Sequence, residues 1–302
     1  MTLEHTIGFI EDYMSSYSEE DIVVDFHGGE PLLQFDKIRY TIDELNKIFI
    51  GRINYGITTN GTIISDNILD FLVKNFYYSL SISIDGSKEV HDRNRRLKNG
   101  NGSYEIVIKN AKKILERRDD VRARMTVNTE TVNSLFSSVC ALYQEGFKII
   151  VPAVDYFDSE WDNEKLTVLF EQLQMIKAEL KEGKLKAQIG LLDDYKSNVV
   201  KECTGGSKSF HISSNGEIYP CAFVVGNPQY TIGNVYDGLD SQKTQWFRNI
   251  NQMPIQQCDG CSHERGCIAT RCKILNRILM GDYYNPTPVI CNVENVKYKI
   301  HK

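Results

Sequence analysis

The 302-residue chain has no run of apolar residues long enough to cross a bilayer and no stripe of basic residues. A membrane span needs about 20 consecutive apolar residues, and nucleic-acid binding favours clustered Lys and Arg, whereas this chain has a formal net charge of -5. The opening segment MTLEHTIGFIEDYM has no basic start, and acidic residues interrupt its apolar part, so it is not a secretory signal. We therefore expect a cytoplasmic protein with neither a membrane nor a nucleic acid as partner.

Cysteine is absent from residues 1–139, and seven of the eight cysteines lie at or after Cys203. A chain in the reducing cytosol has little use for disulfides. A tail this rich in cysteine therefore indicates metal or cluster ligation. The eighth, Cys140, stands beside Val139 and Leu142 in a helical pattern, so we interpret it as a small hydrophobic residue of the core.

The first half of the chain alternates short apolar runs with amphipathic segments. The amphipathic segments predict helices at 66–76 and 134–145, and Gly146 stops the second. The apolar runs are typical of parallel strands covered on both faces, and they predict strands at 22–26, 53–58, 79–84, 121–126 and 147–154. Alternating strands and helices imply βαβ units, so we expect an α/β fold with a parallel sheet.

The alternation opens with a helix, at about 3–16, before the first predicted strand. A β/α barrel normally opens with a strand, so we expect a partial (β/α)6 TIM-like barrel that misses its first strand. A long helical stretch at 162–182 ends this part, and the charged segment 181–186 marks a boundary. We predict a barrel domain at 1–183 and a small cysteine-rich domain at 184–302.

The second predicted domain lacks the alternation of strands and helices that is found in the first. Residues 209–221 predict a hairpin, because Asn215-Gly216 is a strong tight-turn signal. Loops, two short helices and cysteines are expected after it. Large apolar residues are too few for a separate core, so bound metal should hold this region together.

Three polar motifs follow the first three predicted strands: HGGEP at 27–31, TTNG at 58–61 and SISIDG at 81–86. Ligands of parallel α/β sheets bind at the carboxyl ends of the strands. Adjacent glycines allow a ligand to approach the backbone closely. Any one of these motifs is more often a simple turn, but three at successive strand ends indicate a binding site.

The segment FHGGEPLL at 26–33 resembles the Gly-Gly-Glu signature of radical S-adenosylmethionine (SAM) enzymes. The segments 57–61 and 81–86, followed by His91-Asp92-Arg93, resemble the matching segments of the peptide-modifying branch of that family. The resemblance implies that the Gly-Gly-Glu loop binds the amino end of SAM and that Ser83 or Asp85 lies near it. Arg124 would meet the SAM carboxylate, which an Arg fork suits, although a surface position is the alternative. The implied SAM site consists of Gly28, Gly29, Glu30, Thr59, Asn60, Ser83, Asp85 and Arg124.

The cysteines of the tail are regularly spaced. Twelve residues separate Cys203 from Gly216, and four more precede Cys221; the pattern Cys258-x2-Cys261-x5-Cys267-x4-Cys272 and a final Cys291 follow. Seven thiolates are too many for one four-ligand site and one short of two. Zinc sites with four cysteines use similar spacings, so zinc is the alternative to iron–sulfur clusters.

This spacing resembles the SPASM domain of peptide and sulfatase maturases, with four residues in place of the usual three before Cys272. The resemblance implies two auxiliary 4Fe-4S clusters. An outer cluster would be held by Cys258, Cys261, Cys267 and Cys291. An inner cluster would be held by Cys203, Cys221 and Cys272, and its open iron could take a substrate thiolate or a small ligand.

The residue after Cys221 bears on the substrate. In sulfatase maturases an aspartate that acts as a base follows this cysteine, whereas here the residue is Ala222. We therefore favour a maturase that forms a thioether or another crosslink on a ribosomally made precursor peptide. The resemblance implies SAM and a reductant such as a flavodoxin or a ferredoxin as its partners.

The family's catalytic cluster needs a Cys-x3-Cys-x2-Cys loop after the first barrel strand, and no cysteine precedes Cys140. The missing strand and the missing cysteines belong to the same segment, so we expect a fragment of an enzyme, inactive unless that segment is restored. The alternatives are a non-catalytic peptide-binding module with clusters and a zinc-stabilised structural protein. The catalytic residues stay unknown, and residues 155–161 could line a substrate mouth or form a solvated loop.

Overall fold

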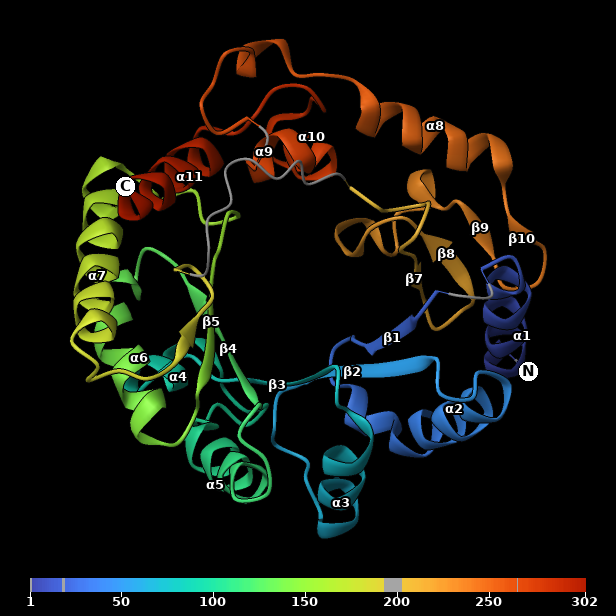
Figure 1. The fold of residues 1–302 in the computed structure, drawn as a ribbon, viewed down its shortest axis with the longest axis horizontal. Coiled ribbons are helices and arrows are strands. Elements are labelled where there is room, and N and C mark those ends of the chain that lie inside the picture. The colour runs from blue at the N-terminus through green and yellow to red at the C-terminus, as the bar shows by residue number, and fades with distance from the viewer. Residues whose placement is uncertain (1, 18–19, 193–202, 265) are drawn as a thin grey trace. The chain divides into compact units, whose positions relative to one another are not determined.

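The computed structural model describes residues 2–17, 20–192, 203–264 and 266–302. Contacts divide the chain into two compact units (Figure 1). The sheet unit consists of Asp21–Asp194 and Lys299–Lys302, and the cysteine unit consists of Met1–Glu20 and Tyr195–Tyr298. No helix among the described residues is both long and apolar enough to span a membrane.

The sheet unit is built on six parallel strands in the order β1-β2-β3-β4-β5-β6, so strands that follow each other in sequence are also neighbours in space. Their bounds are β1 (Ile22–Phe26), β2 (Ile53–Thr59), β3 (Ser79–Ser83), β4 (Arg122–Val127), β5 (Ile149–Val154) and β6 (Gln188–Ile189). This confirms the predicted α/β fold, and the five predicted strands lie within two residues of the observed bounds. The sequence did not predict β6, which has only two residues.

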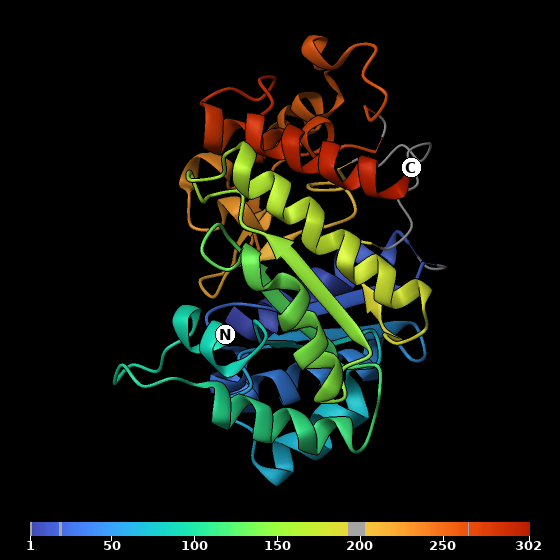
Figure 2. The same cartoon turned by 90° about the vertical axis from the view of Figure 1, so that its left-hand side faces the viewer.

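Helices connect these strands and cover one face of the sheet (Figure 2, where α6 and α7 lie over β5). Ser65 accepts a hydrogen bond from the Ile68 N–H at the start of α3, and Asp162 accepts one from the Lys165 N–H at the start of α7. The elements are η1 (Pro31–Gln34), α2 (Phe35–Ile48), α3 (Asp66–Asn75), α4 (Lys88–Asn94), α5 (Tyr104–Leu115), η2 (Val132–Ser134), α6 (Leu135–Gln144) and α7 (Asn163–Lys181).

The two faces of the sheet differ in chemistry. In β4, Ala123 and Met125 are buried toward the helices, whereas Arg124 between them is exposed on the other side. The expectation of strands that are apolar on both faces is therefore wrong for β4, which alternates. We call the side opposite the helices the polar face; it carries Thr58, Ser81, Ser83, Arg122 and Arg124. Alternation of this kind leaves one face of a sheet available to polar ligands.

The cysteine unit contains a small antiparallel sheet in the order β10-β9-β8-β7. Its strands are β7 (His211–Ile212), β8 (Glu217–Tyr219), β9 (Gly233–Asn234) and β10 (Gly238–Leu239). The pair β7–β8 is the predicted hairpin. Its turn needs glycine, because Gly216 has φ +89° and a Cβ there would lie 2.8 Å from Val235 Cγ2.

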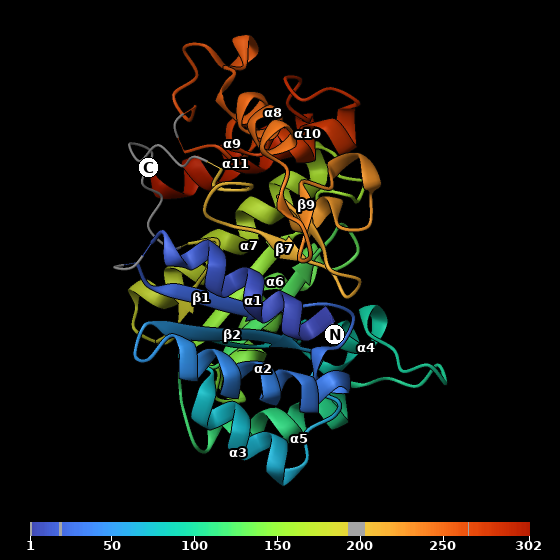
Figure 3. The same ribbon diagram turned by 90° about the vertical axis from the view of Figure 1, so that its right-hand side faces the viewer.

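Two short 3-10 helices lie between β8 and β9, and further helices follow β10 (Figure 3). They are η3 (Ala222–Val224), η4 (Pro228–Tyr230), α8 (Ser241–Gln252), η5 (Gln256–Cys258), α9 (Ile268–Arg271), α10 (Lys273–Met280) and α11 (Pro288–His301). The expectation of two short helices is therefore wrong. The 12-residue α8 escaped prediction because it buries only three residues on one face, namely Thr244, Phe247 and Ile250.

The cysteine unit also has apolar clusters of its own, contrary to the expectation that large apolar residues are too few. One cluster contains the fully buried Tyr219 and Phe247 with Ile274, and a second contains Ile218 and Ile232. The sequence hides these clusters because their members come from β8, α8, α10 and the loops between them. Side-chain packing and bound metal can therefore both stabilise this unit.

The first helix, α1 (Thr2–Ser15), belongs to the cysteine unit rather than to the predicted barrel domain. Phe9 packs on the second apolar cluster, the Tyr13 ring lies edge-on to Phe210 at 4.9 Å, and the Tyr13 hydroxyl donates to the Ser207 carbonyl at 2.5 Å. The sequence could not assign α1, because its partners lie about 200 residues further along the chain.

Candidate functional site

The Gly28-Gly29-Glu30 loop follows β1, and its carboxylate joins the ends of two strands. Glu30 Oε1 accepts from the Leu32 N–H at 3.0 Å and from the Thr59 hydroxyl at 2.7 Å, and Glu30 Oε2 accepts from the Asn60 N–H at 2.7 Å. Gly28 has φ +144°, a conformation that favours glycine. The structure thus brings five of the predicted SAM-site residues together, with Glu30 fixing the shape of the loop.

His27 lies beside this loop and was not predicted as a site residue. Its Nε2 is 2.9 Å from Asp25 Oδ2, and this hydrogen bond raises the pKa of His27, while the nearby charge of Arg124 opposes the rise. Gly56 on β2 makes room for the pair, because a Cβ there would lie 2.7 Å from Asp25 Oδ1. His27 and Arg124 therefore lie close enough for their charges to interact, although they come from β1 and β4.

Ser83 and Arg124 are partners in register on β3 and β4 and belong to the polar face. Arg124 is exposed in mid-strand, next to Arg122, whose guanidinium donates to the Ser79 hydroxyl at 3.2 Å. The open guanidinium of Arg124 is suited to a carboxylate. The structure therefore favours a ligand role for Arg124 over the alternative of an outer-surface residue.

Asp85, a predicted SAM-site residue, is surrounded by hydrogen-bond donors of the protein. Its side chain is fully buried, and Arg95 donates to both carboxylate oxygens, at 2.8 and 3.1 Å. The Thr126 N–H and Asn94 Nδ2 donate to it as well. With these donors around it, Asp85 anchors the segment after α4 to the sheet.

His91 of α4 is a second buried polar residue. Its Nδ1 accepts from the Asp85 N–H at 3.3 Å, so its Nε2 carries the proton toward the Ser103 hydroxyl at 2.9 Å. Burial lowers the pKa of His91 to about 4. The imidazole is therefore neutral at physiological pH and has a structural role.

The loop at 155–161 is tied to its neighbours. Asp158 Oδ2 accepts from both the N–H and the hydroxyl of Thr129 at 2.8 Å, and the buried Trp161 donates from Nε1 to the Asp155 carbonyl. Phe157 is exposed. Hydrogen bonds therefore hold this loop, with Trp161 buried and Phe157, Ser159 and Glu160 exposed.

The tail cysteines form two groups in the cysteine unit. Cys203, Cys221 and Cys272 lie close enough that the charge of each thiolate affects the others. Similar mutual effects join Cys258, Cys261, Cys267 and Cys291. The groups have the same members as the predicted inner and outer cluster sites. In the part of the chain that the structure describes, no three His, Cys, Asp or Glu side chains converge at the spacing of a single metal ion.

Three of these cysteines stand immediately before a short helix. Cys221 precedes η3, Cys267 precedes α9 and Cys272 precedes α10. Backbone N–H groups at the helix starts lower the pKa of these thiols: Phe223 acts on Cys221, Ala269 and Thr270 act on Cys267, and Leu275 acts on Cys272. Such N–H donors favour the thiolate form and tune the potential of an iron–sulfur cluster.

Burial acts on the thiols in the opposite direction. It raises the pKa of Cys221 and of Cys267 to about 11 and also raises that of Cys258, Cys272 and Cys291. Buried thiols lose their protons when they bind a positively charged metal centre. Grouped, half-buried sulfurs with N–H donors therefore fit iron–sulfur clusters.

Family comparisons agree with these two sites. Residues 5–134 match the Radical SAM superfamily, and residues 203–262 match the SPASM iron–sulfur cluster-binding domain. The chain therefore contains a region that matches the Radical SAM superfamily and a region that matches the SPASM domain.

Two relatives are anaerobic sulfatase-maturating enzymes. The cysteine-type enzyme of Clostridium novyi is 27% identical over 270 residues, covering 81% of this chain and 71% of the relative. The serine-type enzyme of Bacteroides thetaiotaomicron is 25% identical over 302 aligned residues, covering 86% and 71%.

Solved structures share the fold. Native anSMEcpe with bound AdoMet superimposes with a TM-score of 0.77 at 20% identity, over 99% of this chain and 86% of that one. Streptococcus suis SuiB bound to precursor peptide SuiA gives a TM-score of 0.68 at 15% identity, over 94% and 69%.

Proposed function

We propose that this radical SAM protein modifies a ribosomally made peptide, for example by forming a thioether or another crosslink. The observation that carries the proposal is the grouping of seven thiols into sets of three and four, in a chain that also has a radical SAM strand-end site. Relatives that mature sulfatases, and a structural neighbour bound to its precursor peptide, support a peptide as the substrate.

The two units would have different roles in this function. The Gly28-Gly29-Glu30 loop with Thr59 and Asn60 would hold the amino end of SAM, and Arg124 would orient its carboxylate. Bound SAM supplies hydrogen-atom abstraction from the substrate. The two thiol groups would hold two auxiliary 4Fe-4S clusters, and the group of three leaves one position for a further ligand. A flavodoxin or ferredoxin would supply electrons.

The catalytic cluster needs three cysteines that residues 1–139 do not contain. We therefore expect the 302-residue polypeptide alone to form no 5′-deoxyadenosine from SAM under reducing conditions. Joining a Cys-x3-Cys-x2-Cys segment ahead of residue 2 should restore the formation of 5′-deoxyadenosine. If the joined protein binds peptide but still cleaves no SAM, the alternative of a non-catalytic peptide-binding module holds.

Metal analysis tests the cluster assignment. Anaerobically purified protein should contain about eight irons with matching sulfide. Cys272→Ala and Cys267→Ala should each lower the iron content by about four, because each removes a ligand of one group only. Cys140→Ala is the matched control and should leave the iron unchanged, since Cys140 lies in α6 of the sheet unit. Stoichiometric zinc without iron would support the zinc-stabilised alternative instead.

The substrate can be narrowed with two peptides. A sulfatase-type peptide with a central cysteine tests the activity of the relatives. Because Ala222 stands where those enzymes have a base, we expect no formylglycine from it. Formation of formylglycine at the rate of a sulfatase maturase would rule out the crosslinking proposal.

A further inference from the structure

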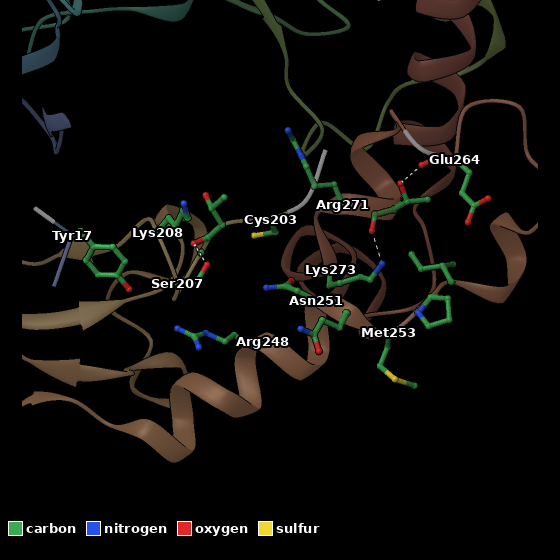
Figure 4. A pocket seen from close by; sticks show the side chains of 16 residues that line it. Tyr17, Cys203, Ser207, Lys208, Arg248, Asn251, Met253, Glu264, Arg271 and Lys273 are labelled. Atoms are coloured by element: carbon green, nitrogen blue, oxygen red, sulfur yellow. Dashed lines mark hydrogen bonds between the residues drawn. The ribbon is translucent and has the colours of Figure 1, made fainter. Parts of the chain in front are cut away.

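The cysteine unit contains a cavity of about 880 Å³ (Figure 4). Its walls come from the loop 203–208, from α8 with the segment after it, and from the region of α9 and the start of α10. Cys203 of the three-cysteine group is part of the wall. The cavity therefore adjoins the thiol group that offers an open position.

The charge of the lining is strongly positive. Lys208, Arg248, Arg271 and Lys273 line the cavity, and Glu264 is the carboxylate among the lining residues. This lining is opposite in sign to the whole chain, whose net charge is -5. Lining cations of one sign attract an anionic ligand.

Not all of these cations are free for a ligand. Lys208 forms an ion pair with Glu20 at 3.4 Å. The buried Lys273 donates a hydrogen bond to the Thr270 carbonyl and interacts electrostatically with Cys258 and Cys272. Lys273 therefore offsets the negative charge of the thiolates. Arg248 and Arg271 have no carboxylate partner among the described residues, so the excess charge that faces the cavity is theirs.

Asn251 provides a second, independent observation. It lines the cavity from α8, and both its Oδ1 and its Nδ2 are buried without a hydrogen-bond partner among the described residues. A buried amide without partners is costly, by about 1–3 kcal/mol for each group. Its oxygen needs a donor and its nitrogen needs an acceptor, a combination that a peptide group supplies and an ionised carboxylate does not.

We propose that this cavity binds an acidic segment of a peptide, with side-chain carboxylates on Arg248 and Arg271 and a backbone amide on Asn251. Arg forks carboxylates through two parallel hydrogen bonds, so two arginines suit two acidic side chains. The inference rests on the proposed peptide substrate and adds to it that acidic residues lie near the position to be modified.

Binding of two neutralised tetrapeptides tests the inference. The probes are acetyl-Gly-Glu-Glu-Gly-amide and its Gln-Gln counterpart, titrated calorimetrically into the full chain with reconstituted clusters. The Glu peptide should bind at least about tenfold more tightly than the Gln peptide. Arg248→Gln, Arg271→Gln and Asn251→Ala should each weaken the Glu peptide by about tenfold. Lys243→Gln is the matched control, because Lys243 is exposed on the same helix outside the lining, and it should change nothing.

Several outcomes would overturn the inference. These are equal binding of the two peptides, no binding of either, or equal weakening by Lys243→Gln. Inorganic phosphate that binds as tightly as the Glu peptide, with no effect of Asn251→Ala, would show a general anion site instead. If Arg271→Gln loses iron, Arg248→Gln carries the test, because Arg248 is exposed on α8. The joined enzyme could bind the Glu peptide selectively and yet modify no peptide. That result would support the cavity as an acidic-peptide site and would reject the proposed function.

Discussion

Three acidic or histidine side chains of the sheet unit are paired within the protein. Asp85 is enclosed by Arg95, Asn94 and a backbone N–H, and His91 is held between the Asp85 N–H and Ser103. Glu30 receives three donors from neighbouring strand ends. These groups fix the shape of the loops at the strand ends, whereas Arg124 is exposed.

His91 should make the stability of the protein depend on pH. The folded pKa of about 4 is depressed below the ordinary value of 6.5, so the unfolded chain binds more protons between these values. Its contribution is therefore fully present above pH 6.5 and is lost as the pH falls toward 4, by ~3 kcal/mol in total. Urea unfolding of the wild type and of His91→Gln at pH 7 and pH 4.5 measures this.

The variant is expected to lose less stability than the wild type between the two pH values. His27→Gln is the matched control, because His27 is half-exposed and its pKa is raised rather than lowered. A parallel pH dependence of the wild type and His91→Gln would contradict the assignment of a neutral, buried His91.

Glu30→Gln should weaken SAM binding. The Gln amide nitrogen would face either the Asn60 N–H or the Thr59 hydroxyl, and both donate to Glu30. Loss of one such bond with a buried donor left unpaired costs about 1–3 kcal/mol, so the SAM dissociation constant should rise about tenfold or more. Equilibrium dialysis of the joined enzyme with SAM measures the change.

Asp36→Asn, an exposed change in the first turn of α2, is the control for Glu30→Gln and should leave SAM affinity unaltered. Unchanged affinity in Glu30→Gln would mean that the Gly-Gly-Glu loop does not depend on this carboxylate.

Strands and helices differ in how well the sequence pattern predicts them. The bounds of β1 were predicted correctly, because a short apolar run between polar segments defines it, whereas the two-residue β6 has no pattern of its own. The members of the two cysteine groups followed from spacing and family resemblance. The role of Asp85 could not be foreseen, because its partner Arg95 lies ten residues along, beyond a helix that folds back on the strand end.

Helix α1 should stabilise the cysteine unit through its aromatic residues. His5, Phe9, Tyr13 and Tyr17 recur every four residues, and rings of neighbouring members lie 5–6 Å apart in the pairs Phe9–Tyr13 and Tyr13–Tyr17. Tyr13→Ala removes the contact with Phe210 and the bond to Ser207, which should destabilise the unit by ~2–4 kcal/mol. Hydrogen exchange of amides in β7 and β8 reports this loss.

Tyr13→Phe keeps the ring and should cost only about 1 kcal/mol, while the exposed Glu11→Ala should cost nothing measurable. Equal protection of β7 and β8 in Tyr13→Ala and in the wild type would show that α1 is not part of the cysteine unit in solution.

At the scale of the whole molecule, the chain crosses between its units more than once. It begins in the cysteine unit, builds the sheet unit from Asp21 to Asp194, and returns to the cysteine unit. The radical SAM match at 5–134 and the SPASM match at 203–262 follow sequence order, whereas the compact units do not. The sheet unit and the cysteine unit are therefore connected by the chain at both ends of the segment Asp21–Asp194.

The placement of α1 has a consequence for folding during synthesis. During synthesis α1 is made before its partners, because Ser207 and Phe210, which contact Tyr13, follow it by about 190 residues. At 5–20 residues per second the aromatic side of α1 waits roughly 10–40 s for its partner. During that interval Phe9 and Tyr13 lack the contacts with the second apolar cluster, Phe210 and Ser207 that cover them in the folded cysteine unit.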